Sequence, residues 1–64
     1  MNDQHPPLRV GDRVTYVHQG NPIPLIVNAV RWCPDGGEWY VTASDPTITL
    51  TVFRRAAWFA RGWP

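Results

Sequence analysis

The chain lacks the covalent and metal supports on which very small proteins usually rely. Its 64 residues allow one small domain, whose hydrophobic core alone gives marginal stability. A single cysteine, Cys33, excludes an internal disulfide framework. Together with His5 and His18, this cysteine does not complete a closed tetrahedral zinc site. We therefore expect neither a metal nor a cofactor, and self-association becomes one way to stabilise the fold.

Charge and long apolar runs are also scarce. The net charge of +1 is too small to indicate nucleic-acid or membrane binding by itself. Lysine is absent, which we attribute to codon composition rather than to anion recognition by the six arginines. No apolar run reaches the length of a membrane span, and the first residues are polar rather than a leader. We expect a cytoplasmic protein, in which a lone cysteine stays reduced.

Proline and glycine make up 12 of the 64 residues, which excludes a single long helix. Valine, isoleucine and threonine make up 15 residues and favour strands. Residues 1–9, which include Pro6 and Pro7, are expected to form a flexible arm. Residues 10–64 are expected to form the single domain.

Alternating apolar and polar residues predict five strands. They cover residues Arg13–His18, 25–32, Glu38–Ser44, 47–53 and 58–60. Residues 19–24 are predicted to be a loop, residues 33–37 a hairpin turn, and residues 54–57 one helical turn. This pattern predicts an all-β, five-stranded SH3-like barrel with a short helical turn before the last strand. An OB-fold normally needs more residues and a helix between its third and fourth strands.

The third and fourth strands alternate most regularly. The side chains expected to face inward are Trp39, Val41, Ala43, Ile48, Leu50 and Val52. Tyr40 and Phe53 are expected to face outward.

The segment that begins Gly11-Asp12-Arg13-Val14 and ends at Gly20 resembles the opening of KOW and Tudor barrels. That resemblance implies an SH3-like fold and keeps nucleic-acid binding as an alternative.

A second resemblance covers residues 11–61, which are similar to the barrel of the plasmid-encoded type II dihydrofolate reductases. It rests on the GDRV opening, on Ile26-Val27, on Trp39-Tyr40-Val41 and on the run LTVFRRAA at residues 50–57. Those enzymes are tetramers with a Val-Gln-Ile-Tyr segment lining a central pore, and residues 50–53 stand at the matching place as Leu-Thr-Val-Phe. The amide and phenol that hold cofactor and substrate are absent. The resemblance therefore implies the fold and self-association, with the enzyme activity as a remote alternative.

The aromatic residues are the best candidates for binding. The C-terminal set exceeds what one small core is expected to bury, and an exposed apolar patch usually marks an interface. We expect protein contacts at Phe53, Trp58, Phe59 and Trp63, with Trp32 and Tyr40 as a second patch. The nucleic-acid alternative would use Arg31, Arg54 and Arg55 beside Trp32 and Tyr40.

No nucleophile and base stand in a recognisable catalytic context. The sequence thus predicts a non-enzymatic binding module, a bacterial, phage or plasmid accessory protein that contacts another protein or itself. We expect no membrane partner.

Overall fold

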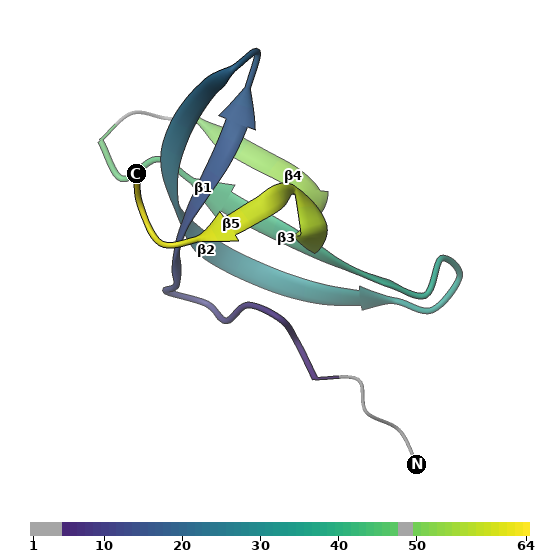
Figure 1. Cartoon of the computed structure of the whole chain (residues 1–64). Helices are drawn as coiled ribbons and strands as arrows, with labels where there is room; N and C mark the ends of the chain where they lie inside the picture. Colours follow the sequence, from purple (N-terminus) through teal and green to yellow (C-terminus); the bar gives the residue numbers. More distant parts are fainter. Residues whose placement is uncertain (1–4, 48–49) are drawn as a thin grey trace.

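Five antiparallel strands form one sheet in the order β4-β3-β2-β1-β5 (Figure 1). The computed structural model describes residues 5–47 and 50–64. The strands are β1 (Arg13–His18), β2 (Asn21–Cys33), β3 (Glu38–Ser44), β4 (Thr51–Arg55) and β5 (Phe59–Arg61). A 3-10 turn, η1 (Ala56–Trp58), connects β4 to β5. The predictions of an all-β chain, five strands and a helical turn before the last strand are confirmed.

The loop predicted over residues 19–24 is wrong, because β1 and β2 are joined by a two-residue turn. His18 pairs with Asn21, and only Gln19 and Gly20 lie between them. Their φ angles are 51° and 82°, and two-residue hairpin turns of this kind need positive φ at both positions. Glycine adopts that conformation without strain, so the turn closes at Gly20 and β2 begins at once.

Two prolines lie inside β2, where proline is normally excluded. Pro22 lies opposite Val17, and Pro24 lies opposite Thr15. In a two-residue hairpin the pair that closes the turn, here His18 with Asn21, is hydrogen-bonded, and every second pair after it is too. The two proline pairs fall between these, so the proline nitrogens point away from β1. The pairing of β2 with β3 starts only at Ile26. The missing N–H groups therefore cost no ladder bond.

A β-bulge between Val27 and Ala29 divides β2 into two halves. Pairing with β1 covers Asn21 to Ile26 before the bulge, whereas pairing with β3 runs from Ile26 through the bulge to Cys33. The extra residue, Asn28, donates a side-chain hydrogen bond of 2.7 Å to the Ser44 hydroxyl. A bulge bends its strand and increases its twist, and Figure 1 shows β2 curving through the molecule. The bend lets both halves of the sheet enclose one core.

The turn between β2 and β3 is confirmed. The Gly37 N–H donates to the Cys33 carbonyl at 2.9 Å, and the φ of Gly37 is 64°. The fourth strand begins at Thr51, later than predicted. Ile48 lies outside the described residues.

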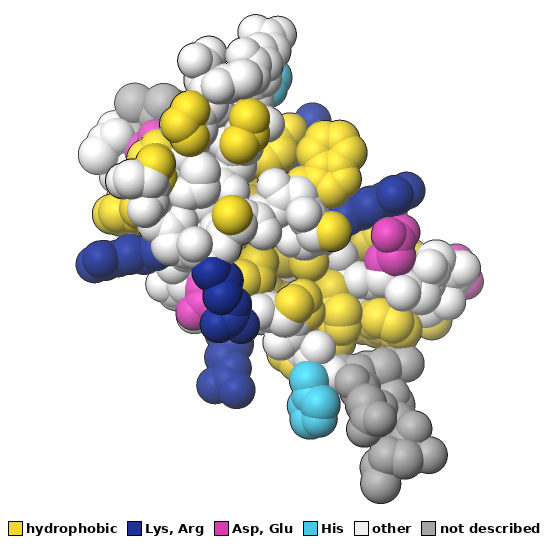
Figure 2. Space-filling view, viewed as in Figure 1, with side chains coloured by type: hydrophobic (Ala, Val, Ile, Leu, Met, Phe, Trp, Pro, Cys, Tyr) yellow, Lys and Arg dark blue, Asp and Glu magenta, His cyan; other side chains and the backbone are white. Residues whose placement is uncertain are grey.

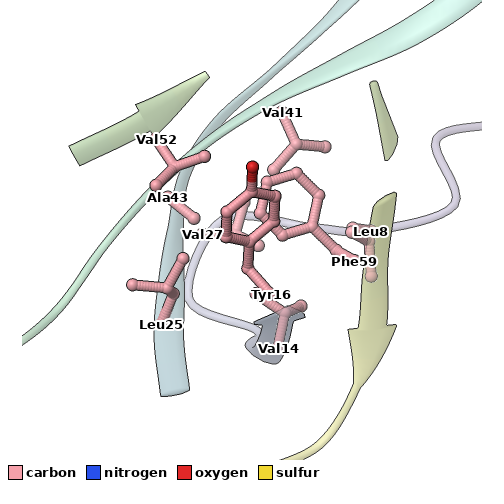
Figure 3. Packing of buried hydrophobic residues seen from close by; sticks show 9 residues of the cluster. All are labelled: Leu8, Val14, Tyr16, Leu25, Val27, Val41, Ala43, Val52 and Phe59. Carbon is pink, nitrogen blue, oxygen red and sulfur yellow. The ribbon is translucent and has the colours of Figure 1, made fainter. Parts of the chain in front are cut away.

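The core contains side chains from all five strands (Figure 3). It is formed by Leu8, Val14, Tyr16, Leu25, Val27, Val41, Ala43, Val52 and Phe59. Trp39, predicted to belong to this core, is only half-buried. It lies near the end of the β2–β3 hairpin, which Figure 1 shows projecting beyond the other strands.

Leu8 precedes every strand, yet only 3% of its surface is exposed. The backbone after it is held by two reciprocal bonds: the Arg9 N–H donates to the Asp12 carboxylate at 2.9 Å, and the Asp12 N–H donates to the Arg9 carbonyl at 3.0 Å. The Arg61 guanidinium donates to the Pro7 carbonyl at 2.6 Å. This end of the predicted arm is therefore attached to the sheet.

Candidate functional site

Two aromatic rings are stacked on the outer surface of β3 and β4. The ring centroids of Tyr40 and Phe53 are 5.3 Å apart, with 19° between the ring planes. Tyr40 pairs with Arg55 and Phe53 pairs with Thr42, so the two aromatics are diagonal neighbours on the same side of the sheet. Phe53 is 52% exposed, as expected from its outward position. The ring pair is therefore accessible from solvent.

Charged side chains surround this stack. The Arg55 Nε lies 3.4 Å from a Glu38 carboxylate oxygen. The pKa of Arg55 is raised above its ordinary value, first by a hydrogen bond with Tyr40 and then by the negative charge of Glu38. Arg31 lies opposite Tyr40 in the β2–β3 register and is exposed. We call Arg31, Glu38, Tyr40, Phe53 and Arg55 the aromatic face.

The structure does not bring Trp32 together with Tyr40. Trp32 pairs with Trp39, and their ring centroids are 5.3 Å apart at 58°. Adjacent positions of a strand point to opposite sides, so Trp39 and its partner lie on the side opposite Tyr40. The predicted second patch is thus divided between two sides of the hairpin.

The three arginines proposed for nucleic acid are also divided. Arg31 and Arg55 both pair with Tyr40 and share its side of the sheet. Arg54 pairs with Val41, a core residue, and so lies on the other side. Only two of the three are therefore part of one surface.

Within the C-terminal set, Phe59 is a core residue rather than a surface contact, because β5 adds to β1 and turns its first side chain inward. It is 8% exposed, and its ring lies 5.6 Å from that of Tyr16. Trp58 is more than half exposed. Its ring also stacks on Tyr16, with 6.4 Å between the ring centroids and 13° between the ring planes.

Trp63 is held against β1 and β2. Its indole N–H donates to the Leu25 carbonyl at 2.9 Å, and the Arg13 guanidinium lies 4.8 Å from its ring centroid. The adjacent Gly62 N–H donates to the Arg13 carbonyl at 2.8 Å. These contacts give Trp63 a structural role, although 41% of its surface remains exposed.

A pocket of about 180 Å³ lies between the β1–β2 hairpin and β4. It is lined by Tyr16, His18, Ile23, Leu50, Thr51, Val52 and Arg54. The two walls come from strands that are not neighbours in the sheet, so strand periodicity alone did not indicate this pocket.

No family model, curated protein or solved structure matches the chain. Over residues 5–47 and 50–64, no three His, Cys, Asp or Glu side chains gather where they would hold a metal ion. The same residues include no helix of the length and hydrophobicity that a bilayer crossing requires. Figure 2 shows hydrophobic side chains at the surface, interrupted by basic and acidic ones.

Proposed function

We propose that this chain is an SH3-like barrel that acts as a non-enzymatic binding module through protein–protein contact. The strand order, the bend in β2 and the 3-10 turn before β5 support that fold. Small barrels serve many functions, so the exposed side chains rather than the fold determine what such a domain binds.

The observation that carries the proposal is the exposed stack of Tyr40 on Phe53. Buried aromatic residues and arginine contribute most of the affinity in many interfaces, while a charged rim excludes water. The aromatic face has this composition, because two arginines and Glu38 surround the rings. Covering the stack would remove a large apolar surface from water.

A second copy of the chain is the partner that fits this surface best. A two-fold dimer brings the same patch together from both protomers, so the patch must complement itself. The aromatic face carries both signs of charge: Arg31 and Arg55 are cationic and Glu38 is anionic. A two-fold arrangement can therefore place a guanidinium of one copy opposite Glu38 of the other, with the rings between them.

Sedimentation velocity over a range of protein concentrations tests this proposal. We expect the wild-type chain to dimerise and Phe53→Ser to weaken the dimer by at least about 30-fold, the effect of losing one interface hot spot. Val17→Ser is the matched control, because Val17 is more exposed than Phe53 and lies on β1, outside the aromatic face. A dimer of unchanged strength in Phe53→Ser, or a wild-type chain that stays monomeric, would contradict the proposal.

Nucleic-acid binding is the second candidate, favoured by the shared side of Arg31, Tyr40 and Arg55. Arginines beside exposed rings can contact phosphates and stack bases. Anisotropy of labelled single- and double-stranded DNA would show binding that weakens steeply with salt, because phosphate contacts release counterions. Absence of binding at low salt would remove this candidate. The remote reductase alternative is tested by NADPH-dependent reduction of dihydrofolate.

A further inference from the structure

The pocket between the β1–β2 hairpin and β4 has an apolar interior. Ile23 contributes one wall, and Leu50 and Val52 contribute the other. Ile23 and Leu50 are only partly buried, although both pack against the core. An apolar group that entered the pocket would cover these side chains and gain their hydrophobic contact.

Arg54 supplies hydrogen-bond donors to the pocket. Arg54 is exposed, and one guanidinium nitrogen donates to the Phe53 carbonyl at 2.8 Å. A guanidinium has five N–H donors, so others remain for a ligand. In the described part of the chain, Arg54 has no carboxylate within ion-pair distance. Within residues 5–47 and 50–64, no side chain thus neutralises the cation at the pocket.

Tyr16 adds a second donor to the pocket. It is 5% exposed and lines the pocket, yet its hydroxyl takes part in none of the side-chain hydrogen bonds among residues 5–47 and 50–64. Figure 3 shows this hydroxyl pointing away from β1, toward Val41 and Val52. The His18 ring, which also lines the pocket, stacks beside Tyr16 with 6.3 Å between centroids. No enclosed side-chain oxygen or nitrogen among the described residues lacks a hydrogen-bond partner, so the Tyr16 hydroxyl is accessible from the pocket and can donate to a ligand there.

We infer that this pocket binds a small monocarboxylic acid whose body is branched or aromatic. The carboxylate would accept hydrogen bonds from Arg54 and from the Tyr16 hydroxyl, and the apolar body would lie against Ile23, Leu50 and Val52. A pocket of about 180 Å³ is smaller than the roughly 300–1,000 Å³ of sites for drug-sized ligands. A phosphate has no apolar body for these walls and would lose its hydration against them.

The site is independent of the proposed dimer. Arg54 and the aromatic face lie on opposite sides of the sheet, as the pairing of Arg54 with Val41 requires. A ligand in the pocket therefore need not compete with a second chain on Phe53.

Titration of the isotope-labelled chain with benzoate, followed by amide and methyl NMR signals, tests the inference. Benzamide is the ligand control, because it has nearly the same shape and no charge. We expect benzoate to shift the signals of Ile23, Leu50 and Val52 with a millimolar dissociation constant, as suits a ligand of few atoms. Benzamide should bind about tenfold more weakly or not at all.

Two substitutions separate the pocket from the rest of the surface. Arg54→Gln should weaken benzoate binding about tenfold, and Tyr16→Phe should weaken it several-fold while keeping the ring in the core. Arg9→Gln is the matched control, because it removes one exposed arginine that lies outside both the pocket and the aromatic face, and it should leave benzoate binding unchanged. Equal binding of benzoate and benzamide, no shifts up to about 50 mM benzoate, or equal losses in Arg54→Gln and Arg9→Gln would overturn the inference.

Discussion

Replacing Leu8 by alanine tests whether the segment before β1 is part of the fold. Leu8 is buried among side chains from the strands, although the sequence places it in an arm. The substitution removes three carbons, which at about 0.8 kcal/mol each corresponds to roughly 2.4 kcal/mol of lost transfer free energy. Incomplete closure of the cavity adds to this, and buried Leu→Ala changes cost about 2–5 kcal/mol in general.

We expect Leu8→Ala to lower the free energy of unfolding by about 2–3 kcal/mol, because a segment outside the strands can shift to fill part of the space. A domain of this size is stabilised by only about 3–5 kcal/mol, so most of its stability would be lost. The melting temperature should fall by about 10–20 °C, which circular dichroism measures directly.

Val10→Ala is the control, because Val10 is 68% exposed two residues further along the same segment. Leu8→Val keeps part of the side chain, so its melting temperature should lie between those of Leu8→Ala and Val10→Ala. This variant remains measurable if Leu8→Ala does not fold. A melting temperature for Leu8→Ala equal to that of Val10→Ala would show that Leu8 does not stabilise the core and belongs to a flexible arm.

Three further outcomes follow from the same structure. Phe59→Ala should cost about 3–5 kcal/mol in chemical denaturation, whereas Phe53→Ala should cost less than about 1 kcal/mol, because only Phe59 is buried. Gln19→Asn should raise the melting temperature by about 2–4 °C, because asparagine suits the positive φ of this turn better. Because the pKa of Arg55 is higher in the folded chain than its ordinary value, the stability contributed by its charge is fully present at any pH below that ordinary value. This contribution is lost only as the pH rises through the raised pKa. Stability–pH curves of wild type and Arg55→Gln should therefore be parallel at neutral pH.

The bounds of two strands were predictable from the sequence. The bounds of β1 and β3 agree with the expectation, and Phe53 was correctly expected to face outward. Strand β2 was predicted too short because Pro22 and Pro24 indicate a loop. The strand accommodates these prolines only because both lie in pairs that are not hydrogen-bonded. The Gln19–Gly20 turn sets that register.

The candidate surfaces were only partly predictable, because they depend on pairing between strands. Alternation indicates that Tyr40 and Phe53 face outward, but only the β3–β4 register makes them neighbours. Phe59 was expected at the surface, and the addition of β5 to β1 buries it. The pocket joins Tyr16 and Arg54 across the bend in the sheet, which no local pattern encodes.

The most direct test of the central claim, that the aromatic face joins two copies of the chain, is an isotope-filtered NOE experiment. A mixture of labelled and unlabelled chains reports contacts between protomers only. We expect intermolecular NOEs that connect the Tyr40 and Phe53 rings of one protomer with the aromatic face of its partner. Intermolecular NOEs confined to Trp58 or Trp63, or none at the highest attainable concentration, would contradict it.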